Sequence, residues 1–282
     1  MIKKKIYLTI DFEDWKYDTS LYFGFSNKNK INEEILYKTF YNIQNFIKKN
    51  LRDDKITFFC TGILAKKFPD IIKEIDNSGH EIACHYFNHK VVTQDTIVNF
   101  EYNLQKSKDV FENLTNKPLK GFRAPKFSIS HSHREYLKVV SKYFEYDSSL
   151  NLKSISELKT ISCDDININF FPVMTSNFFF NLFRYKPGGT YMKMFPYMLL
   201  YNNVLETFNK NENSILYLHP YEFLYDRELS FNISDLKNKN ILFTFYWLIR
   251  QNQWISGNSF ILTKLEKIFN EFESGGKIED LL

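Results

Sequence analysis

Apolar residues follow two spacings in turn along most of the chain. A period of two, or a short apolar run, predicts strands at residues 6–10, 56–60, 81–84, 144–147 and 215–218, and a strand end at 121–125. Helical spacing predicts helices at residues 33–50, 64–75, 97–114, 132–142, 236–250 and 260–272. Strands that alternate with helices are typical of a parallel α/β sheet or barrel. We therefore expect a catalytic domain over residues 1–225 and a helical C-terminal extension over 226–282.

Composition narrows the class of protein only slightly. The 282 residues are 44% apolar, which is sufficient for a large core. The formal charge is +4, and the lysines are interleaved with acids instead of forming a basic stripe. A nucleic-acid partner is therefore not expected. Three dispersed cysteines, Cys60, Cys84 and Cys163, are too few for a disulfide framework.

The first residues and the longest apolar runs indicate whether the chain is exported or crosses a membrane. MIKKKIYLTIDFEDW has a basic start, but its short alternating stretch leads directly into acids, unlike a signal peptide. Apolar runs also stay well below the roughly 18 residues of a membrane-spanning helix. We expect no integral membrane segment and a cytoplasmic protein, with peripheral association at the inner membrane face left open. The oligomeric state is also left open.

Polar residues that can carry chemistry share one placement in the predicted sheet. They lie at or just beyond the C-terminal ends of predicted strands, the edge where active sites assemble in parallel α/β folds. These residues are Asp11, Glu13, Asp14, His85, His89, Arg123, Asp147 and His219. Several strands thus bring acids, imidazoles and a guanidinium to one rim, which predicts an active site there.

His85 and His89 are four residues apart after a predicted strand. This spacing places both imidazoles on the same side of a helix, and a tight loop can do the same. Two neutral imidazoles and one carboxylate form a three-ligand zinc site with an open position for water. The same ligand set also binds iron in oxygenases. We expect a divalent metal ion, with zinc the first choice.

Five segments resemble, in order and spacing, the motifs of the polysaccharide deacetylase family, also known as the NodB-homology family or carbohydrate esterase family four. They are LTIDFEDW, ITFFCTG, GHEIACHYFNH, FRAP and ILYLHP. The DFEDW variant, with RAPKFS, YDSS and HPYE, is similar to a subgroup found near bacterial polysaccharide biosynthesis genes. The resemblance extends from about Lys4 to Glu222.

The resemblance implies a distorted (β/α)₇ barrel that hydrolyses acetamido groups on sugars with a metal ion. It implies metal ligands at His85, His89 and one acid of the first motif, and a general base at a second acid. Arg123 would keep that base ionised and oriented. His219 would be the general acid for the departing amine, with Asp147 orienting it.

The identity of the base and of the acidic ligand depends on the alignment. The family usually has Thr-Phe-Asp-Asp-Gly in its first motif, with the base directly before the ligand. Aligned from the right, Glu13 is the base and Asp14 the ligand. Aligned along the strand, Asp11 is the base and either Glu13 or Asp14 is the ligand. We favour Asp11 as base and Asp14 as ligand.

The resemblance also implies contacts with the substrate. They are expected at Pro125, Lys126 and Phe127, where the backbone N–H after Pro125 would help to stabilise the oxyanion. Tyr86, in the place of the usual Ser or Thr after the first histidine, is a further expected contact.

Three functions compete at this point. The leading hypothesis is the metal-dependent release of acetate from an N-acetylated sugar or glycan precursor, lipid-linked or nucleotide-linked. An amidohydrolase of the allantoinase or cyclic-imide type is the second, and retention of both His85 and His89 argues against its metal-free form. The third is an inactive glycan-binding barrel, which would have no need of Arg123 and His219.

Overall fold

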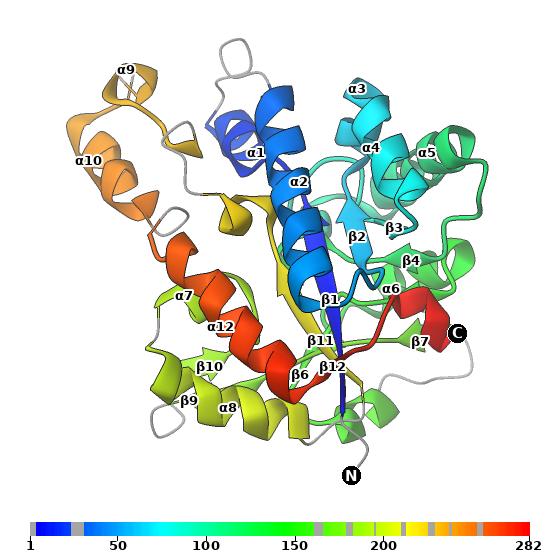
Figure 1. Ribbon diagram of the computed structural model, residues 1–282. Coiled ribbons are helices and arrows are strands. Elements are labelled where there is room, and N and C mark those ends of the chain that lie inside the picture. The colour runs from blue at the N-terminus through cyan, green and yellow to red at the C-terminus, as the bar shows by residue number, and fades with distance from the viewer. Residues whose placement is uncertain are drawn as a thin grey trace.

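The computed structural model describes residues 4–23, 31–160, 166–178, 183–194, 196–209, 213–224, 229–236, 239–252 and 256–282. A curved sheet of parallel strands lies at its centre (Figure 1). The strand order is β11-β1-β2-β3-β4-β5-β7, and β12 also pairs with β1. The bounds are β1 Lys5–Phe12, β2 Thr57–Cys60, β3 Glu81–Cys84, β4 Gly121–Phe122, β5 Tyr146–Asp147, β7 Asn169–Phe170, β11 Asn213–Leu218 and β12 Glu273–Ser274.

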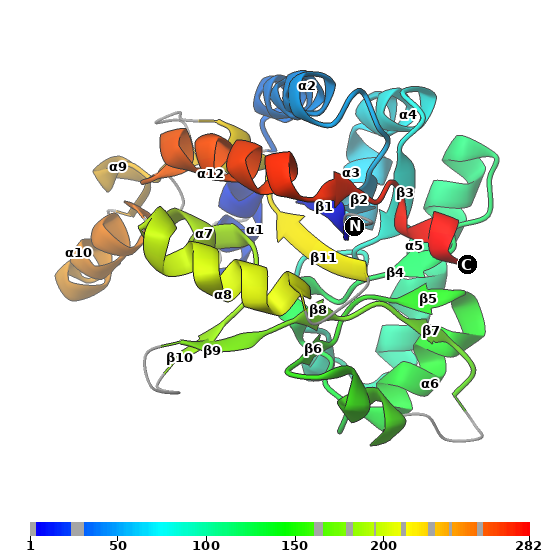
Figure 2. The ribbon, with the colours of Figure 1, turned by 60° about the horizontal axis from the view of Figure 1, so that its bottom comes forward.

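Helices connect the strands and cover the outer face of the sheet (Figure 2). They are α1 Trp15–Tyr22, α2 Glu33–Asn50, α3 Gly62–Lys67, α4 Pro69–Asn77, α5 Ile97–Thr115, α6 Arg134–Tyr143 and, near the C-terminus, α12 Asn258–Glu271. Two further helices, α9 Ile233–Leu236 and α10 Ile241–Arg250, lie at the edge of the molecule, away from the sheet (Figure 1). The predicted parallel α/β class is confirmed, as a distorted barrel. In the described part of the chain the barrel is open, because β7 and β11 end the strand order.

Smaller elements follow β5 and lie next to β11. They are β6 Asn151–Leu152, which pairs with β8 Val173–Met174, the antiparallel pair β9 Ser176–Phe178 and β10 Phe183–Tyr185, and the helices α7 Gly189–Met194 and α8 Tyr197–Asn209. Gly188 forms a bridge to Tyr217 of β11. Its φ is +143°, and a Cβ there would lie 2.1 Å from the Tyr217 carbonyl oxygen. Only glycine allows this approach.

The inner and outer faces of β1 have different roles. Successive residues of a strand point to opposite faces. The even-numbered residues Ile6, Leu8, Ile10 and Phe12 belong to the large core beneath the helices. Tyr7 belongs to a second cluster, together with Phe59, Tyr146 and Tyr217 of other strands. Thr9 and Asp11 therefore share the inner face with Tyr7, and both are buried.

Two predicted helices are each divided in two. The segment expected as one helix over 64–75 is interrupted at Phe68, because Pro69 has no N–H to continue the hydrogen bonds and begins α4 instead. The segment expected over 236–250 is interrupted before Asn240, whose side chain accepts a hydrogen bond from the Phe243 N–H and starts α10.

The C-terminal segment contributes to the barrel itself. Ile261, Leu265 and Ile268 of α12 are buried in the large core, and β12 extends the sheet beside the start of β1. Within the described residues, no helix has the length and apolar character needed to cross a membrane. Cys60 and Cys84 are buried free thiols, while Cys163 lies outside the described residues.

Candidate functional site

The C-terminal end of β1 supplies two buried carboxylates on the inner face of the barrel. Asp11 is 3% exposed and Glu13 is 5% exposed. They are two residues apart, so the extended backbone points both side chains to the same side. Asp14 is one residue further on, and its side chain points toward the start of α1. Both of its carboxylate oxygens accept backbone hydrogen bonds, from Tyr17 at 2.9 Å and from Asn32 at 3.2 Å.

The two histidines follow β3. The Nδ1 atom of His85 lies 2.8 Å from the backbone carbonyl of Arg123. A carbonyl only accepts hydrogen bonds, so Nδ1 carries the proton and Nε2 has the free lone pair. Nε2 is buried and has no hydrogen-bond partner among the described residues. Burial lowers the pKa of His85 to about 4, outweighing nearby Asp11, so its imidazole is neutral at pH 7.

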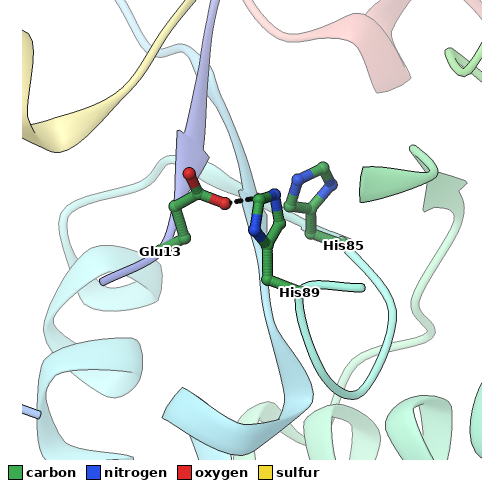
Figure 3. Close-up of side chains that lie close together, drawn as sticks. All are labelled: Glu13, His85 and His89. Atoms are coloured by element: carbon green, nitrogen blue, oxygen red, sulfur yellow. Dashed lines mark ion pairs between the residues drawn. The ribbon is translucent and has the colours of Figure 1, made fainter. Parts of the chain in front are cut away.

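Glu13, His85 and His89 converge at one point (Figure 3). Oε2 of Glu13 lies 2.5 Å from Nε2 of His89, and the two imidazole centroids are 5.3 Å apart. One ligand atom from each of the three residues lies within 4.8 Å of the others. Burial alone would raise the pKa of Glu13, but the adjacent histidines, His89 above all, bring it below its ordinary value. Two imidazoles and an ionised carboxylate can hold a divalent metal ion.

This geometry corrects the expected acidic ligand. We favoured Asp14 in the sequence, but Asp14 is the N-cap of α1, and Glu13 is the carboxylate beside both histidines. The physical reason is the two-residue period of β1, which places Asp11 and Glu13 on the inner face and turns Asp14 toward the start of the helix.

Asp11 is held by the fully buried Arg123. One guanidinium nitrogen, NH1, lies 2.7 Å from Oδ1 of Asp11 and 2.8 Å from the Thr9 hydroxyl. The other donors of Arg123 bind the carbonyl and the hydroxyl of Ser148. Burial would raise the pKa of Asp11, but the charge of Arg123 outweighs it, so the pKa lies below its ordinary value. Asp11 is therefore ionised at neutral pH, as a general base requires.

His219 follows β11 and is held by Glu222. The backbone N–H of His219 donates to Oε2 of Glu222 at 2.9 Å, and the imidazole Nδ1 is 3.6 Å from the same oxygen. Glu222 is fully buried, with Lys193 Nζ 3.8 Å from its other oxygen. Burial alone would lower the pKa of His219, but the carboxylates of Glu222, Glu13 and Asp11 raise it to about 9.

Asp147 does not have the expected position beside His219. Its carboxylate accepts hydrogen bonds from the backbone N–H and the hydroxyl of Ser149, at 3.0 and 2.6 Å. The Ser149 hydroxyl oxygen in turn accepts from the Ala124 N–H at 2.8 Å. Asp147 therefore supports the loop that begins at Arg123, and the orienting carboxylate for His219 is Glu222. Burial raises the pKa of Asp147 to about 6.

The expected substrate contacts separate into two groups. Pro125, Lys126 and Phe127 form a single tight turn in which Lys126 and Phe127 have positive φ. Lys126 is exposed, and the Phe127 ring lies edge-on to Tyr217 at 4.9 Å. A substrate role for these three residues stays a prediction.

Tyr86 is placed differently. It is fully buried, and its hydroxyl donates to Asp95 at 2.7 Å. Its φ of +64° belongs to the turn that carries the chain from His85 toward His89. The expectation of a substrate contact is therefore wrong: Tyr86 is buried and supports the loop that carries His85 and His89.

Asp18, one turn into α1, is a site residue that the sequence did not indicate. Its Oδ2 is 3.7 Å from Nδ1 of His89, on the side of the ring opposite Glu13. Burial, with Glu13 and Asp14 nearby, raises the pKa of Asp18 well above its ordinary value. The helix was not predicted, because its only signal is Asp14 as an N-cap before an aromatic-rich segment.

Comparison with known proteins identifies the family. A family model described as polysaccharide deacetylase matches residues 2–142. The chain therefore belongs to the polysaccharide deacetylase family. It is 38% identical over 98 residues to a peptidoglycan deacetylase-like protein of Gibberella zeae, and 32% identical over 94 residues to a peptidoglycan deacetylase of Helicobacter pylori. These matches cover 35% and 33% of this chain and only 28% and 31% of the relatives.

Solved structures show the same fold. A Bacillus anthracis protein described as a CE4 family pseudoenzyme has a TM-score of 0.52 at 17% identity, covering 99% of this chain and 65% of that chain. A protein of Mycobacterium smegmatis described as a putative polysaccharide deacetylase has a TM-score of 0.51 at 15% identity, covering 97% of this chain and 93% of that one. At such identities the likeness establishes the fold alone.

Proposed function

We propose that the protein is a metal-dependent deacetylase that hydrolyses the acetamido group of an N-acetylated sugar to acetate and a free amine. The observation that carries the proposal is the convergence of three separate groups at one rim. They are the triad Glu13, His85 and His89, the ionised Asp11–Arg123 pair, and the cationic His219. Membership of the polysaccharide deacetylase family supports the same reaction class.

The triad suits a divalent ion, with zinc the first choice. The buried lone pair of His85 Nε2 lacks a partner among the described residues, and Nδ1 is fixed by the Arg123 carbonyl. Such an outer hydrogen bond is what orients a metal-binding imidazole. For His89, Oδ2 of Asp18 lies 3.7 Å from Nδ1, which is an ion-pair distance longer than a hydrogen bond. When bound, the ion would supply positive charge that polarises the amide carbonyl and lowers the pKa of water.

Asp11 is proposed as the general base. Its carboxylate is ionised by Arg123 and shares the inner face of the barrel with Glu13. A positioned carboxylate of this kind can take a proton from the attacking water as the new C–O bond forms. Because one guanidinium nitrogen binds both Asp11 and Thr9, the carboxylate is fixed in orientation before substrate arrives.

His219 is proposed as the general acid. Near pH 7 it carries a proton, because its pKa lies near 9. The amine leaves only after the nitrogen is protonated as the C–N bond breaks, and His219 has the proton to donate. Its ring stacks on Tyr221, with centroids 4.9 Å apart. The carboxylate of Glu222 and the ring of Tyr221 together fix its position.

The substrate class is the finer part of the proposal. We propose a precursor of a glycan, lipid-linked or nucleotide-linked, and a cytoplasmic site of action. One relative is named a peptidoglycan deacetylase and the other a peptidoglycan deacetylase-like protein, but their matched segments cover less than a third of their lengths. The choice therefore depends on direct assay.

A screen for acetate release tests the proposed function. The zinc-loaded protein would be incubated with N-acetylated sugars that are free, nucleotide-linked or lipid-linked, and with peptidoglycan fragments. We expect acetate from at least one of them, and a loss of about 10²–10⁴ in turnover for His219→Ala. A ring-opening activity on cyclic amides without acetate release would favour the amidohydrolase alternative. The absence of turnover combined with glycan binding would indicate an inactive barrel.

A further inference from the structure

Exposed apolar side chains gather on one face of α10. Ile241, Leu242, Phe245, Tyr246 and Ile249 are 83, 78, 64, 50 and 57% exposed. Ile233 of the neighbouring α9 is 68% exposed. The two helices lie at the edge of the molecule, away from the sheet (Figure 1). A contiguous surface of this kind on a folded protein usually marks an interaction site.

The opposite face of α10 is firmly packed. Phe243, Trp247 and Leu248 contact a cluster built around Trp15, Phe23 and Phe231. The ring of Phe23 lies 4.6 Å from that of Trp247 and 5.0 Å from that of Phe243. Because this packed side anchors the helix, the side with the exposed apolar residues cannot turn inward and is held toward solvent.

The sequence of α10 and of the residues that follow it contains no acid. Residues 236–265 contain no aspartate or glutamate, although 33 of the 282 residues of the chain are acidic. Lys239 precedes α10, and the exposed Arg250 ends it. Arg250, at the C-terminal end of α10, lies over the rings of Tyr246 and Trp247. The apolar face is therefore flanked by cations and aromatic rings.

We propose that this face of α10 docks on the surface of an anionic lipid bilayer. A helix of ten residues is about 15 Å long, so it cannot span the roughly 30 Å hydrocarbon core, but it can lie in the interfacial plane. Tyrosine and tryptophan favour that interface, and arginine and lysine attract anionic headgroups. The apolar side chains thus suit the hydrocarbon region of the bilayer, the aromatic rings its interface, and the basic groups its anionic headgroups.

A second copy of the chain fits the face less well. An antiparallel pair of α10 helices would bring Arg250 of one copy toward Lys239 of the other. A parallel pair would place like residues together at both ends. Since residues 236–265 have no acid, nothing on this segment offsets the repulsion.

A series of ring contacts connects the packed side of α10 to the candidate site. The ring centroid of Phe231, next to α10, lies 5.8 Å from that of Trp15, and the Trp15 centroid lies 6.4 Å from that of Tyr221. Tyr221 stacks on His219. If the proposed function holds, a lipid-linked sugar would be presented at this side. The docking itself does not depend on that function, and its test measures no catalysis.

Vesicle sedimentation tests the docking. The full chain would be mixed with vesicles of phosphatidylcholine alone or with added phosphatidylglycerol. The test variant is Ile241→Asp with Phe245→Asp, four residues apart on α10. The matched control is Val98→Asp with Tyr102→Asp, four residues apart on α5, where these residues are 76 and 64% exposed. Far-UV circular dichroism and the thermal midpoint verify that each variant is folded.

We expect the wild-type chain and the control to sediment with anionic vesicles and to be released by high salt. The α10 variant should partition at least about tenfold more weakly. The proposal is overturned if wild type stays in the supernatant with anionic vesicles, or if the α10 variant binds as well as the control. It is also overturned if ultracentrifugation without lipid shows a dimer that the α10 variant converts to monomer, because a second copy would then cover the face.

Discussion

Replacing Glu222 by glutamine tests how the protonated state of His219 is maintained. The wild-type pKa of about 9 exceeds the ordinary 6.5, which corresponds to about 3 kcal/mol in favour of the charged imidazole, since one pKa unit is about 1.4 kcal/mol. Burial acts in the opposite direction, so the carboxylates supply all of the increase. Glu222 is the foremost of them, with its oxygen 3.6 Å from Nδ1.

We therefore expect the pKa of His219 to fall by at least about one unit in Glu222→Gln. NMR titration of the imidazole in metal-free protein measures it directly, with the exposed His131 as reference in the same spectra. Glu222→Asp keeps the charge and should retain most of the elevation. In the metal-loaded enzyme, the alkaline limb of the pH–rate profile should move to lower pH in Glu222→Gln, because the general acid deprotonates earlier.

Stability should change in the same sense. A histidine whose pKa is raised by folding stabilises the native state fully below pH 6.5, and this contribution is lost as the pH rises through 9. Wild type should therefore lose more unfolding free energy between these pH values than Glu222→Gln. An unchanged pKa for His219 in a folded Glu222→Gln protein would refute the role given to Glu222.

Three further predictions concern other residues. Glu13→Gln should lose bound metal, which metal analysis would show. Asp14→Ala should keep its metal and lose about 1 kcal/mol of unfolding free energy in urea, because Asp14 is an N-cap. Metal loss in Asp14→Ala alone would restore Asp14 as the acidic ligand. Asp11→Asn should keep its metal and lose about 10²–10⁴ in turnover without rescue by added zinc, and normal acetate release would remove Asp11 as the base. Burial lowers the pKa of His80 to about 4. The metal-free fold should therefore lose up to about 3 kcal/mol of unfolding free energy from this residue as the pH falls from 6.5 to 4. Urea unfolding of His80→Asn should show a smaller loss over this range, and an equal loss in both proteins would contradict the prediction.

The sequence was informative wherever one spacing persists over many residues. The helical pattern over residues 33–50 matches α2, because its buried positions recur on one face. The strands predicted at residues 6–10, 56–60, 81–84, 144–147 and 215–218 correspond to β1, β2, β3, β5 and β11. Pro69 is a signal that was present in the chain and not used, since proline begins a helix more readily than it continues one. Strands of two residues, such as β12, are too short for any period to show.

The site was predictable in composition but not in every contact. The acids and histidines were expected at one rim. The two-residue period from Tyr7 through Asp11 would have selected Glu13 over Asp14, had it been continued past the strand. Glu222 is only three residues from His219, but it pairs with Lys193 of α7, a helix that was not predicted. Asp18 depends on a helix with a weak signal. Contacts of these kinds are set by tertiary packing, which sequence spacing does not report.

Zinc titration of the metal-free protein, with acetate release followed in the same samples, tests the central claim most directly. Wild type should bind about one ion per chain, and acetate release should rise in proportion to the zinc bound. Folded Glu13→Gln, His85→Ala and His89→Ala proteins should each bind zinc more weakly and release less acetate at the same zinc concentration. Full acetate release without metal, or unchanged zinc affinity in all three variants, would contradict the proposed metal site.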